Sequence, residues 1–254
     1  TVFDNTNTSV TSVIKSAFEI RPSLENIRSG FQSTELTYDP LVVVQAWQKL
    51  YEAASSNPML WRNPAYQHDL VDVTRQVMAN AFIPLYRNLL STWNTTDSGS
   101  GSASLSKEGD NLINFLRNLD VVLHTNSNFR LSKWIMSARA WAGDNNEASF
   151  LEYNARNQIT LWGPNGEIVD YASKQWSGMV SSFYLPRWRI FIEYLKSTPP
   201  AWYNATDLTG LLMNFDLEWQ HEIWDEPEPS ADAENLQKVL IGVRSRWPSV
   251  FGGR

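Results

Sequence analysis

The spacing of apolar residues constrains the fold of this chain more than any other feature. From Asp39 onwards, apolar positions recur every three or four residues in most segments, whereas the alternation typical of strands never persists. Such spacing gives a helix one apolar face, and helices bury these faces against one another. The sequence therefore predicts an all-α fold, a single multi-helix domain of about nine helices. The clearest predicted helices cover residues 40–54, 65–90, 112–123, 131–141, 188–195, 208–224 and 231–246.

Prolines mark the beginnings of two of these helices. Asp39-Pro40 and Asn63-Pro64 each combine an N-cap residue with a proline at the first helical position, so a helix is predicted to begin at both. Pro84 lies inside the predicted helix 65–90. It is expected to kink that helix, because proline lacks the amide hydrogen and collides with the preceding turn.

Two segments differ from the helices in composition. Residues 1–37 are predicted to form an N-terminal tether, and residues 38–254 the helical domain. The run 94–104 is rich in glycine and serine, most densely near residues 97–103. It is predicted to be a flexible loop, because such a composition supports no core.

The stretch from Asn154 to Arg189 contains the most unusual interruption. It begins as an amphipathic segment, breaks at Trp162-Gly163-Pro164, and is predicted to resume as a helix that ends at a turn over residues 186–189. Residues Gly166 to Val169 are the one place where a short extended piece is expected. A break of this kind among regular helices calls for a reason other than helix packing.

Composition and missing motifs exclude several functional classes. The formal net charge of −6 and the pI near 5.1, with basic residues scattered along the chain, predict no nucleic-acid partner. No apolar run approaches the roughly 18 residues of a membrane span. Because cysteine is absent, disulfides and cysteine-based metal sites are excluded, and no metal or cofactor is predicted. Nucleotide-binding and α/β-hydrolase motifs are missing. His68 and His124 are isolated and favour no catalytic role.

Three sequons for N-glycosylation lie in polar or turn-like segments. They begin at Asn7, Asn94 and Asn204, where glycans would be accessible. The chain starts at Thr1 without a signal peptide, so it is expected to be a mature product or a fragment.

Ionisable residues gather near the C-terminal end. Glu218, Glu222 and Asp225 are predicted to share a helix face beside His221, as a metal site or an acid–base pair requires. The zinc motif HExxH is incomplete, because Asp225 stands where the second histidine belongs. A solvated helix end is therefore the favoured interpretation, and an independent helical enzyme that uses Glu218 and Glu222 is the weaker one.

The chain contains 12 tryptophans, and large aromatic residues usually fill spaces between helices. That interpretation is favoured for Trp47, Trp134, Trp141 and Trp219. Trp162 differs because the helix must stop at the following Gly-Pro. Its indole could stand at a cleft edge, where the C–H face of a sugar ring packs on an aromatic plane. A structural tryptophan under a turn is the competing interpretation, and spacing alone favours it.

The stretch from Asn157 to Arg189 resembles the most recognisable segment of the helical C-terminal domain of α-N-acetylglucosaminidases, glycoside hydrolase family 89. The similarity extends over essentially the whole chain. It rests on Leu161-Trp162-Gly163-Pro164, Gly166, Ile168, Asp170-Tyr171-Ala172, Lys174-Gln175 and Pro186-Arg187-Trp188-Arg189, together with Arg21-Pro22-Ser23-Leu24, Ala46-Trp47 and residues 69–76.

The resemblance implies a division of labour. In that family a (β/α)₈ barrel carries both catalytic glutamates, and the helical domain packs on it and closes one side of the pocket. This chain resembles only the part after the barrel, so it offers no catalytic position. The resemblance implies that Trp162, Ile168 and Tyr171 form the wall that contacts terminal N-acetylglucosamine or completes its cavity. It also implies a secreted or lysosomal/vacuolar protein whose partners are a catalytic barrel and a glycan.

The leading hypothesis is therefore the C-terminal helical portion of an exo-acting α-N-acetylglucosaminidase, inactive by itself. The alternative is a stand-alone helical carbohydrate-binding or protein-interaction module without catalysis. In either case an absent barrel would leave apolar helical surface uncovered, so the chain is expected to self-associate or to hold a second polypeptide.

Overall fold

The computed structural model describes residues 13–95, 102–225 and 235–252. Within these ranges the chain forms eight α-helices, short 3-10 and π-helical turns, and no strand, so the predicted all-α fold is confirmed. The helices are α1 (Pro40–Ser56), α2 (Pro64–Asn94), α3 (Ser102–His124), α4 (Leu131–Arg139), α5 (Asn145–Gln158), α6 (Leu185–Ser197), α7 (Ala205–Gln220) and α8 (Leu236–Arg246).

The first two helices begin where the sequence predicts. The Asp39 carboxylate accepts a hydrogen bond from the Leu41 amide at 2.9 Å. The Asn63 side chain accepts from the amides of Ala65 and Tyr66 at 3.0 and 3.1 Å. In both cases a proline occupies the first turn and has no amide hydrogen to leave unpaired. Local chemistry alone therefore places these helix starts.

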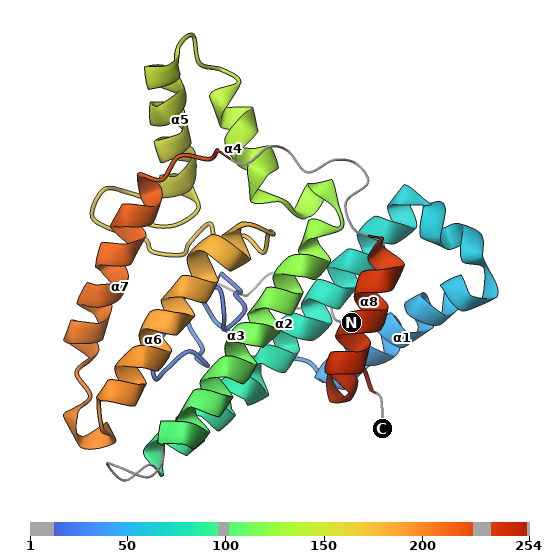
Figure 1. The fold of residues 1–254 in the computed structure, drawn as a ribbon, viewed down its shortest axis with the longest axis horizontal. Helices are drawn as coiled ribbons and strands as arrows, with labels where there is room; N and C mark the ends of the chain where they lie inside the picture. Colours follow the sequence, from blue (N-terminus) through green and yellow to red (C-terminus); the bar gives the residue numbers. More distant parts are fainter. Residues whose placement is uncertain (1–12, 96–101, 226–234, 253–254) are drawn as a thin grey trace.

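The long helices α2 and α3 lie side by side and form the centre of the molecule (Figure 1). Helix α6 packs on α3 and α7 packs on α6, whereas α1 and α8 cover the other side. Helices α4 and α5 form a pair at one end of the molecule. The core between these helices is strongly aromatic, and its fully buried members include Phe82, Phe115, Phe183, Trp188 and Phe191.

The N-terminal segment, residues 13–37, is fixed against the helices although it contains no helix of its own. Phe18 is buried, and its carbonyl accepts a hydrogen bond from the Trp188 indole at 3.0 Å. The Tyr86 hydroxyl in α2 donates to the Ser23 carbonyl at 2.8 Å. The described part of the predicted tether is therefore a packed layer between α2 and α6. The boundary at residue 38 stays a prediction.

Helix α2 passes through Pro84 and continues to Asn94, so the proline lies inside the helix as predicted; the kink itself stays a prediction. Much of the predicted Gly-Ser loop, residues 96–101, lies outside the described residues. Its last residues do not belong to a loop, because α3 begins at Ser102. Leu105 explains this early start, since its buried side chain anchors the first turn of α3.

Two helices end earlier than predicted. Helix α4 ends at Arg139, which leaves Trp141 beyond the helix and 86% exposed, so its predicted core position is wrong. Helix α7 ends at Gln220 and not at residue 224. Trp47 and Trp219 are fully buried, as predicted, and Trp134 is partly buried with its indole donating to the Ala155 carbonyl at 3.0 Å. For α8, the predicted residues 231–234 lie outside the described ranges.

The helix predicted after the break at Trp162 begins only at residue 179, and the turn predicted over residues 186–189 is wrong, because these residues lie inside α6. Residues 163–176 contain turns and irregular chain, and the stretch from Gly166 to Val169 consists mainly of turns and not of extended chain. Helical structure returns with the π-helical turn Val180–Tyr184, which leads directly into α6. Pro186 consequently lies in the first turn of α6. The physical reason is backbone conformation, because four residues have positive φ: Trp162 (54°), Gly163 (146°), Gly166 (74°) and Asp170 (62°).

Candidate functional site

The non-helical loop 160–176 presents a small aromatic surface. The rings of Trp162 and Tyr171 meet edge to face with centroids 5.3 Å apart. Phe31, from the N-terminal segment, stacks beside Tyr171 at 6.2 Å and an interplanar angle of 11°. We call these three residues the aromatic platform. Ile168 lies in the same turn as Tyr171, whose amide donates to the Ile168 carbonyl at 3.2 Å.

The predicted site residues are accessible to a ligand. Trp162, Ile168 and Tyr171 are 38%, 37% and 38% exposed, and Phe31 is more exposed still. Trp162 therefore stands at the surface and not under a turn, as a contact role requires. Phe31 was missed from the sequence, because it lies some 130 residues earlier in a segment without periodicity and only the fold brings it to Tyr171.

The end of α5 sets the position of Trp162. The Trp162 amide donates to the Asn157 carbonyl at 2.8 Å, and the Asn157 side chain donates to the Gly163 carbonyl at 3.0 Å. A Cβ at Gly163 would collide with the Glu167 carboxylate, and the φ of 146° is one that other residues rarely adopt. Glycine is therefore required at position 163 for the chain to turn where the indole faces outward.

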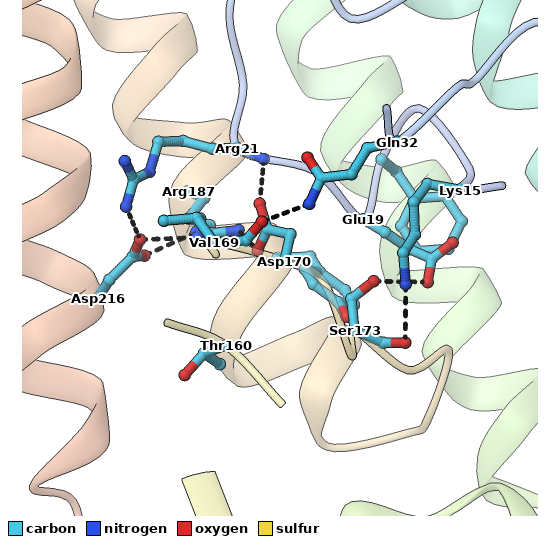
Figure 2. A network of polar contacts seen from close by, with 12 residues as sticks. Lys15, Glu19, Arg21, Gln32, Thr160, Val169, Asp170, Ser173, Arg187 and Asp216 are labelled. Carbon is cyan, nitrogen blue, oxygen red and sulfur yellow. Dashed lines mark hydrogen bonds and ion pairs between the residues drawn. The ribbon is translucent and has the colours of Figure 1, made fainter. Parts of the chain in front are cut away.

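Asp170 precedes Tyr171 in the chain and lies in a network of polar contacts with Arg21 and Arg187 (Figure 2). Its carboxylate is buried and accepts hydrogen bonds from the Arg21 amide at 2.7 Å and the Arg187 guanidinium at 2.8 Å. Its own amide donates to the Thr160 carbonyl at 2.7 Å. Asp170 thus ties the turn that carries Ile168 and Tyr171 to the N-terminal segment and to α6.

Arg187 links this anchor to α7. Its guanidinium is fully buried and makes two parallel hydrogen bonds of 2.6 Å to Asp216 in addition to the bond to Asp170. Arg21 adds a 2.8 Å ion pair to Asp216, so two arginines and two carboxylates balance in charge. The Phe183 ring packs against the Arg187 guanidinium, whose central carbon lies 4.0 Å from the ring centroid. We call Arg21, Asp170, Arg187 and Asp216 the buried ion cluster.

Burial and ion pairing shift the pKa values of these groups in opposite directions. Burial raises the pKa of Asp170 above its ordinary value, although the nearby Arg187 charge opposes the shift. Burial alone would lower the pKa of Arg187, but Asp170 and Asp216 outweigh it and raise that pKa. The arginine therefore stays charged, and the cluster acts as a fixed structural joint.

The N-terminal segment clamps the outer side of the loop. The Gln32 amide donates to the Val169 carbonyl, and Arg28 holds the Gln32 side chain at 3.0 Å. Farther along, Glu19 accepts hydrogen bonds from Ser173 at 3.2 Å and from Gln175 at 2.8 Å. The platform is therefore fixed from both sides before any ligand arrives, which is the preorganisation that a binding surface needs.

The predicted carboxylate face near the C-terminal end does not exist. Because α7 ends at Gln220, Glu222 and Asp225 lie beyond the helix, and only the exposed Glu218 belongs to it. The Glu222 carboxylate lies 3.7 Å from the Arg156 guanidinium. Burial raises the pKa of the Glu222 carboxyl group. The interpretation as an independent enzyme that uses Glu218 and Glu222 therefore lacks its geometric basis. In the described ranges, no group of three or more His, Cys, Asp or Glu could hold a metal ion.

His124 lies near a serine and an aspartate, but the order of contacts is not that of a catalytic triad. Its Nδ1 lies 3.2 Å from the Ser177 hydroxyl, which itself donates to Asp120 at 3.3 Å. A triad requires histidine between the other two residues. Asp120 instead accepts from the amides of Gly178 and Ser181, and therefore caps the helical turn before α6. In the part of the chain that the structure describes, the His68 ring has one hydrogen-bonding contact, to the exposed Asp69 carboxylate at 3.4 Å.

The asparagines of two sequons lie at the surface of the described ranges. Asn94 is the last residue of α2, and Asn204 precedes α7 and caps it; both are exposed. Asn7 lies outside the described residues. None of the helices in the described ranges is long and apolar enough to cross a membrane.

Comparison with known proteins decides the family. Residues 1–241 match the family described as the α-N-acetylglucosaminidase C-terminal domain. The chain belongs to this family. Human α-N-acetylglucosaminidase is 40% identical to it over 176 residues, which are 69% of this chain and 22% of the human protein. The resemblance found in the sequence is thereby confirmed.

Solved structures show the same fold. A family 89 glycoside hydrolase from Clostridium perfringens, in complex with GlcNAc-α-1,4-galactose, superposes with a TM-score of 0.75 at 21% identity. Structures from that organism with PUGNAc and with 2-acetamido-1,2-dideoxynojirmycin give TM-scores of 0.72 and 0.74, each at 22% identity. Each match covers 91% of this chain and 26% of the bacterial chain. This α-N-acetylglucosaminidase C-terminal domain therefore spans about a quarter of the length of these relatives.

Proposed function

We propose that this chain is the C-terminal helical portion of an exo-acting α-N-acetylglucosaminidase, and that the aromatic platform with Ile168 forms one wall of its substrate pocket. Membership of the family supports the activity class. The single observation that carries the wall assignment is the exposure of Trp162, Ile168 and Tyr171 on a loop held by the buried ion cluster.

The catalytic carboxylates belong, in this proposal, to a (β/α)₈ barrel outside the chain. Glycoside hydrolysis ordinarily uses two carboxylates about 5–10 Å apart, both in contact with substrate. Asp170 is the carboxylate next to Tyr171 in the chain, but it is buried and bound to Arg187 and Arg21. It can neither attack a sugar carbon nor exchange a proton with a leaving group. In this proposal the chain positions the substrate, and the barrel supplies the catalytic carboxylates.

The wall would act through shape and apolar contact. The planes of the indole and phenol rings are inclined by 69° in an edge-to-face contact, and both side chains are exposed. A pyranose ring has an apolar C–H face that packs on such a surface, while the indole N–H and the phenol O–H remain available to hydroxyl groups. The proposed ligand is a glycan that ends in α-linked N-acetylglucosamine. We also propose a secreted or lysosomal/vacuolar location, which the exposed sequons at Asn94 and Asn204 support.

Substitution of Trp162 in the full-length enzyme tests the wall directly. Loss of one aromatic contact of about 1–1.5 kcal/mol is expected to raise KM for an aryl α-N-acetylglucosaminide about tenfold. We therefore expect Trp162→Ala to raise KM and to change kcat less. Trp202→Ala is the matched control, because Trp202 is exposed but lies outside the platform. If the two variants have the same KM, Trp162 does not contact the substrate.

The alternative is a stand-alone carbohydrate-binding or protein-interaction module. It is favoured by one observation, the exposure of a preformed platform in this chain itself. It differs from the leading proposal because it requires the chain of 254 residues to hold N-acetylglucosamine without any barrel.

A further inference from the structure

The turn between α6 and α7 presents an exposed tryptophan beside an exposed asparagine. Trp202 is 78% exposed, although tryptophan side chains are highly buried on average. Asn204 is also exposed, and it begins the sequon Asn204-Ala205-Thr206. Two residues of extended chain span at most about 7 Å, so the indole side chain can reach a group attached to Asn204.

Hydrogen bonds on both sides fix the backbone of this turn. The Trp202 amide donates to the Pro199 carbonyl at 2.9 Å, and Trp202 ends a short 3-10 turn. The Tyr194 hydroxyl in α6 donates to the Asn204 carbonyl and accepts from the Asn204 amide, both at 3.0 Å. The Tyr203 ring packs edge to face on the Tyr194 ring, with centroids 5.9 Å apart. Tyr203 therefore packs against the molecule, whereas its two neighbours face solvent.

The two polar atoms of the Asn204 side chain have different roles. Its Oδ1 accepts hydrogen bonds from the amides of Thr206 and Asp207 at 2.9 and 3.4 Å, and so caps α7. In the part of the chain that the structure describes, its Nδ2 donates no hydrogen bond. N-glycosylation takes place at Nδ2, so a glycan on Asn204 leaves the helix cap intact.

The turn lies away from the proposed substrate wall. Helix α6 follows the loop 160–176 in the chain, and its 13 residues extend about 20 Å at 1.5 Å per residue before the turn begins. Figure 1 shows the turn between α6 and α7 at the end of these helices that is farther from α4 and α5. A glycan at this turn therefore leaves the aromatic platform free for substrate.

We propose that Asn204 carries an N-linked glycan whose first N-acetylglucosamine packs its C–H face on the Trp202 indole. A glycosyltransferase joins Nδ2 to C1 of that sugar. Nδ2 loses one proton, and the pyrophosphate of the lipid-linked sugar donor is the leaving group. The contact removes apolar surface of both the sugar and the indole from water. The inference rests on the proposed secreted or lysosomal/vacuolar location, because this modification takes place in the secretory pathway.

The sequon at Asn94 provides a matched comparison. Asn94 is exposed, but the residue two positions before it is a threonine and not an aromatic residue. The adjacent Trp93 is buried, and its indole donates to the Thr198 carbonyl at 2.8 Å. A glycan on Asn94 therefore lacks an exposed indole at the spacing found in the turn between α6 and α7.

Amide hydrogen exchange of the full-length protein, secreted from eukaryotic cells, tests the contact. Mass spectrometry of glycopeptides first measures the occupancy of Asn204. Thr206→Ala removes the sequon at an exposed position and keeps Asn204 as the helix cap. Loss of the sugar–indole contact is expected to speed exchange in residues 200–210 about fivefold, because local opening becomes easier. Trimming the glycan to its first N-acetylglucosamine with an endoglycosidase is expected to leave exchange unchanged, since that sugar makes the contact.

A double-mutant cycle separates this contact from a general effect of glycosylation. In the Trp202→Ala background, Thr206→Ala is expected to change exchange by less than about twofold, because the sugar then has no indole to pack on. Asn94→Gln removes the glycan of the matched sequon and is expected to leave exchange in residues 200–210 unchanged. Equal acceleration by Thr206→Ala with and without Trp202 would overturn the contact. An unoccupied Asn204 would overturn the whole proposal.

The readouts distinguish this inference from the proposed function. Glycan occupancy and hydrogen exchange need no catalysis, and hydrolysis of an aryl α-N-acetylglucosaminide needs no glycan at Asn204. A full-length protein whose Asn204 glycan packs on Trp202 but which hydrolyses nothing would remove the proposed activity and leave this inference. Hydrolysis by a protein with a bare Asn204 would do the reverse.

Discussion

Arg187 is the residue on which the geometry of the platform depends most. It joins α6, α7 and the loop 160–176 through Asp216 and Asp170, entirely out of contact with solvent. A buried cation with two carboxylate partners contributes little net stability compared with an apolar core, but removing it leaves Asp170 without an arginine side chain beside it. Its main effect is on conformation, because it holds Asp170 of the loop to α6 and to Asp216 of α7.

We expect Arg187→Met to lower the free energy of unfolding by about 3–5 kcal/mol, since Asp170 would remain buried without an arginine side chain beside it and Asp216 would keep only Arg21. Lys196→Met is the control, because Lys196 pairs with Glu193 at 2.9 Å on the surface, where such pairs contribute about 0–1 kcal/mol. Denaturant unfolding of both variants measures the difference. Equal losses would show that the cluster does not hold the fold.

Single residues also show where prediction from sequence succeeds. Trp162, Ile168 and Tyr171 came from a family resemblance, and all three are exposed on one loop; their contact with a sugar stays a prediction. Phe31 had no comparable signal, because its place beside Tyr171 depends on how the N-terminal segment crosses the loop. The burial of Asp170 was equally hidden, since an isolated aspartate in a turn normally faces water.

At the scale of elements, helices whose ends depend on local chemistry were the predictable ones. The N-caps Asp39 and Asn63 act within their own first turns, so α1 and α2 begin where the sequence indicates. The segment after the break at Trp162 was wrongly predicted to resume as a helix before residue 179, because Asp170 has a positive φ and is held by Arg187 and Arg21. A bond from Asp170 to Arg187 overrides the helical propensity of the intervening residues.

The conformation of Gly163 tests this account of the loop. We expect Gly163→Ala to destabilise the chain by about 1–3 kcal/mol, because the φ of 146° at this position is one that alanine rarely adopts. Gly210→Ala in α7 is the matched control, since a Cβ there meets nothing within 4 Å. Alanine in a helix interior is favoured over glycine by about 0.5–1 kcal/mol, so the control is expected to be stabilising. Thermal midpoints that move in the same direction would contradict the account.

At the scale of the whole molecule, the helices support one prepared face, the aromatic platform. The all-α architecture could be predicted from periodicity alone. The platform could be predicted only in part, because the fold brings Phe31 to Tyr171 from a distant part of the chain.

The central claim is that this chain positions the substrate while another portion performs the chemistry. The most direct test is hydrolysis of an aryl α-N-acetylglucosaminide by the purified chain of 254 residues, with and without the barrel polypeptide. We predict no turnover by the chain alone and recovery of turnover when the barrel is added. Turnover by the chain alone would contradict the division of labour and return catalysis to the helices.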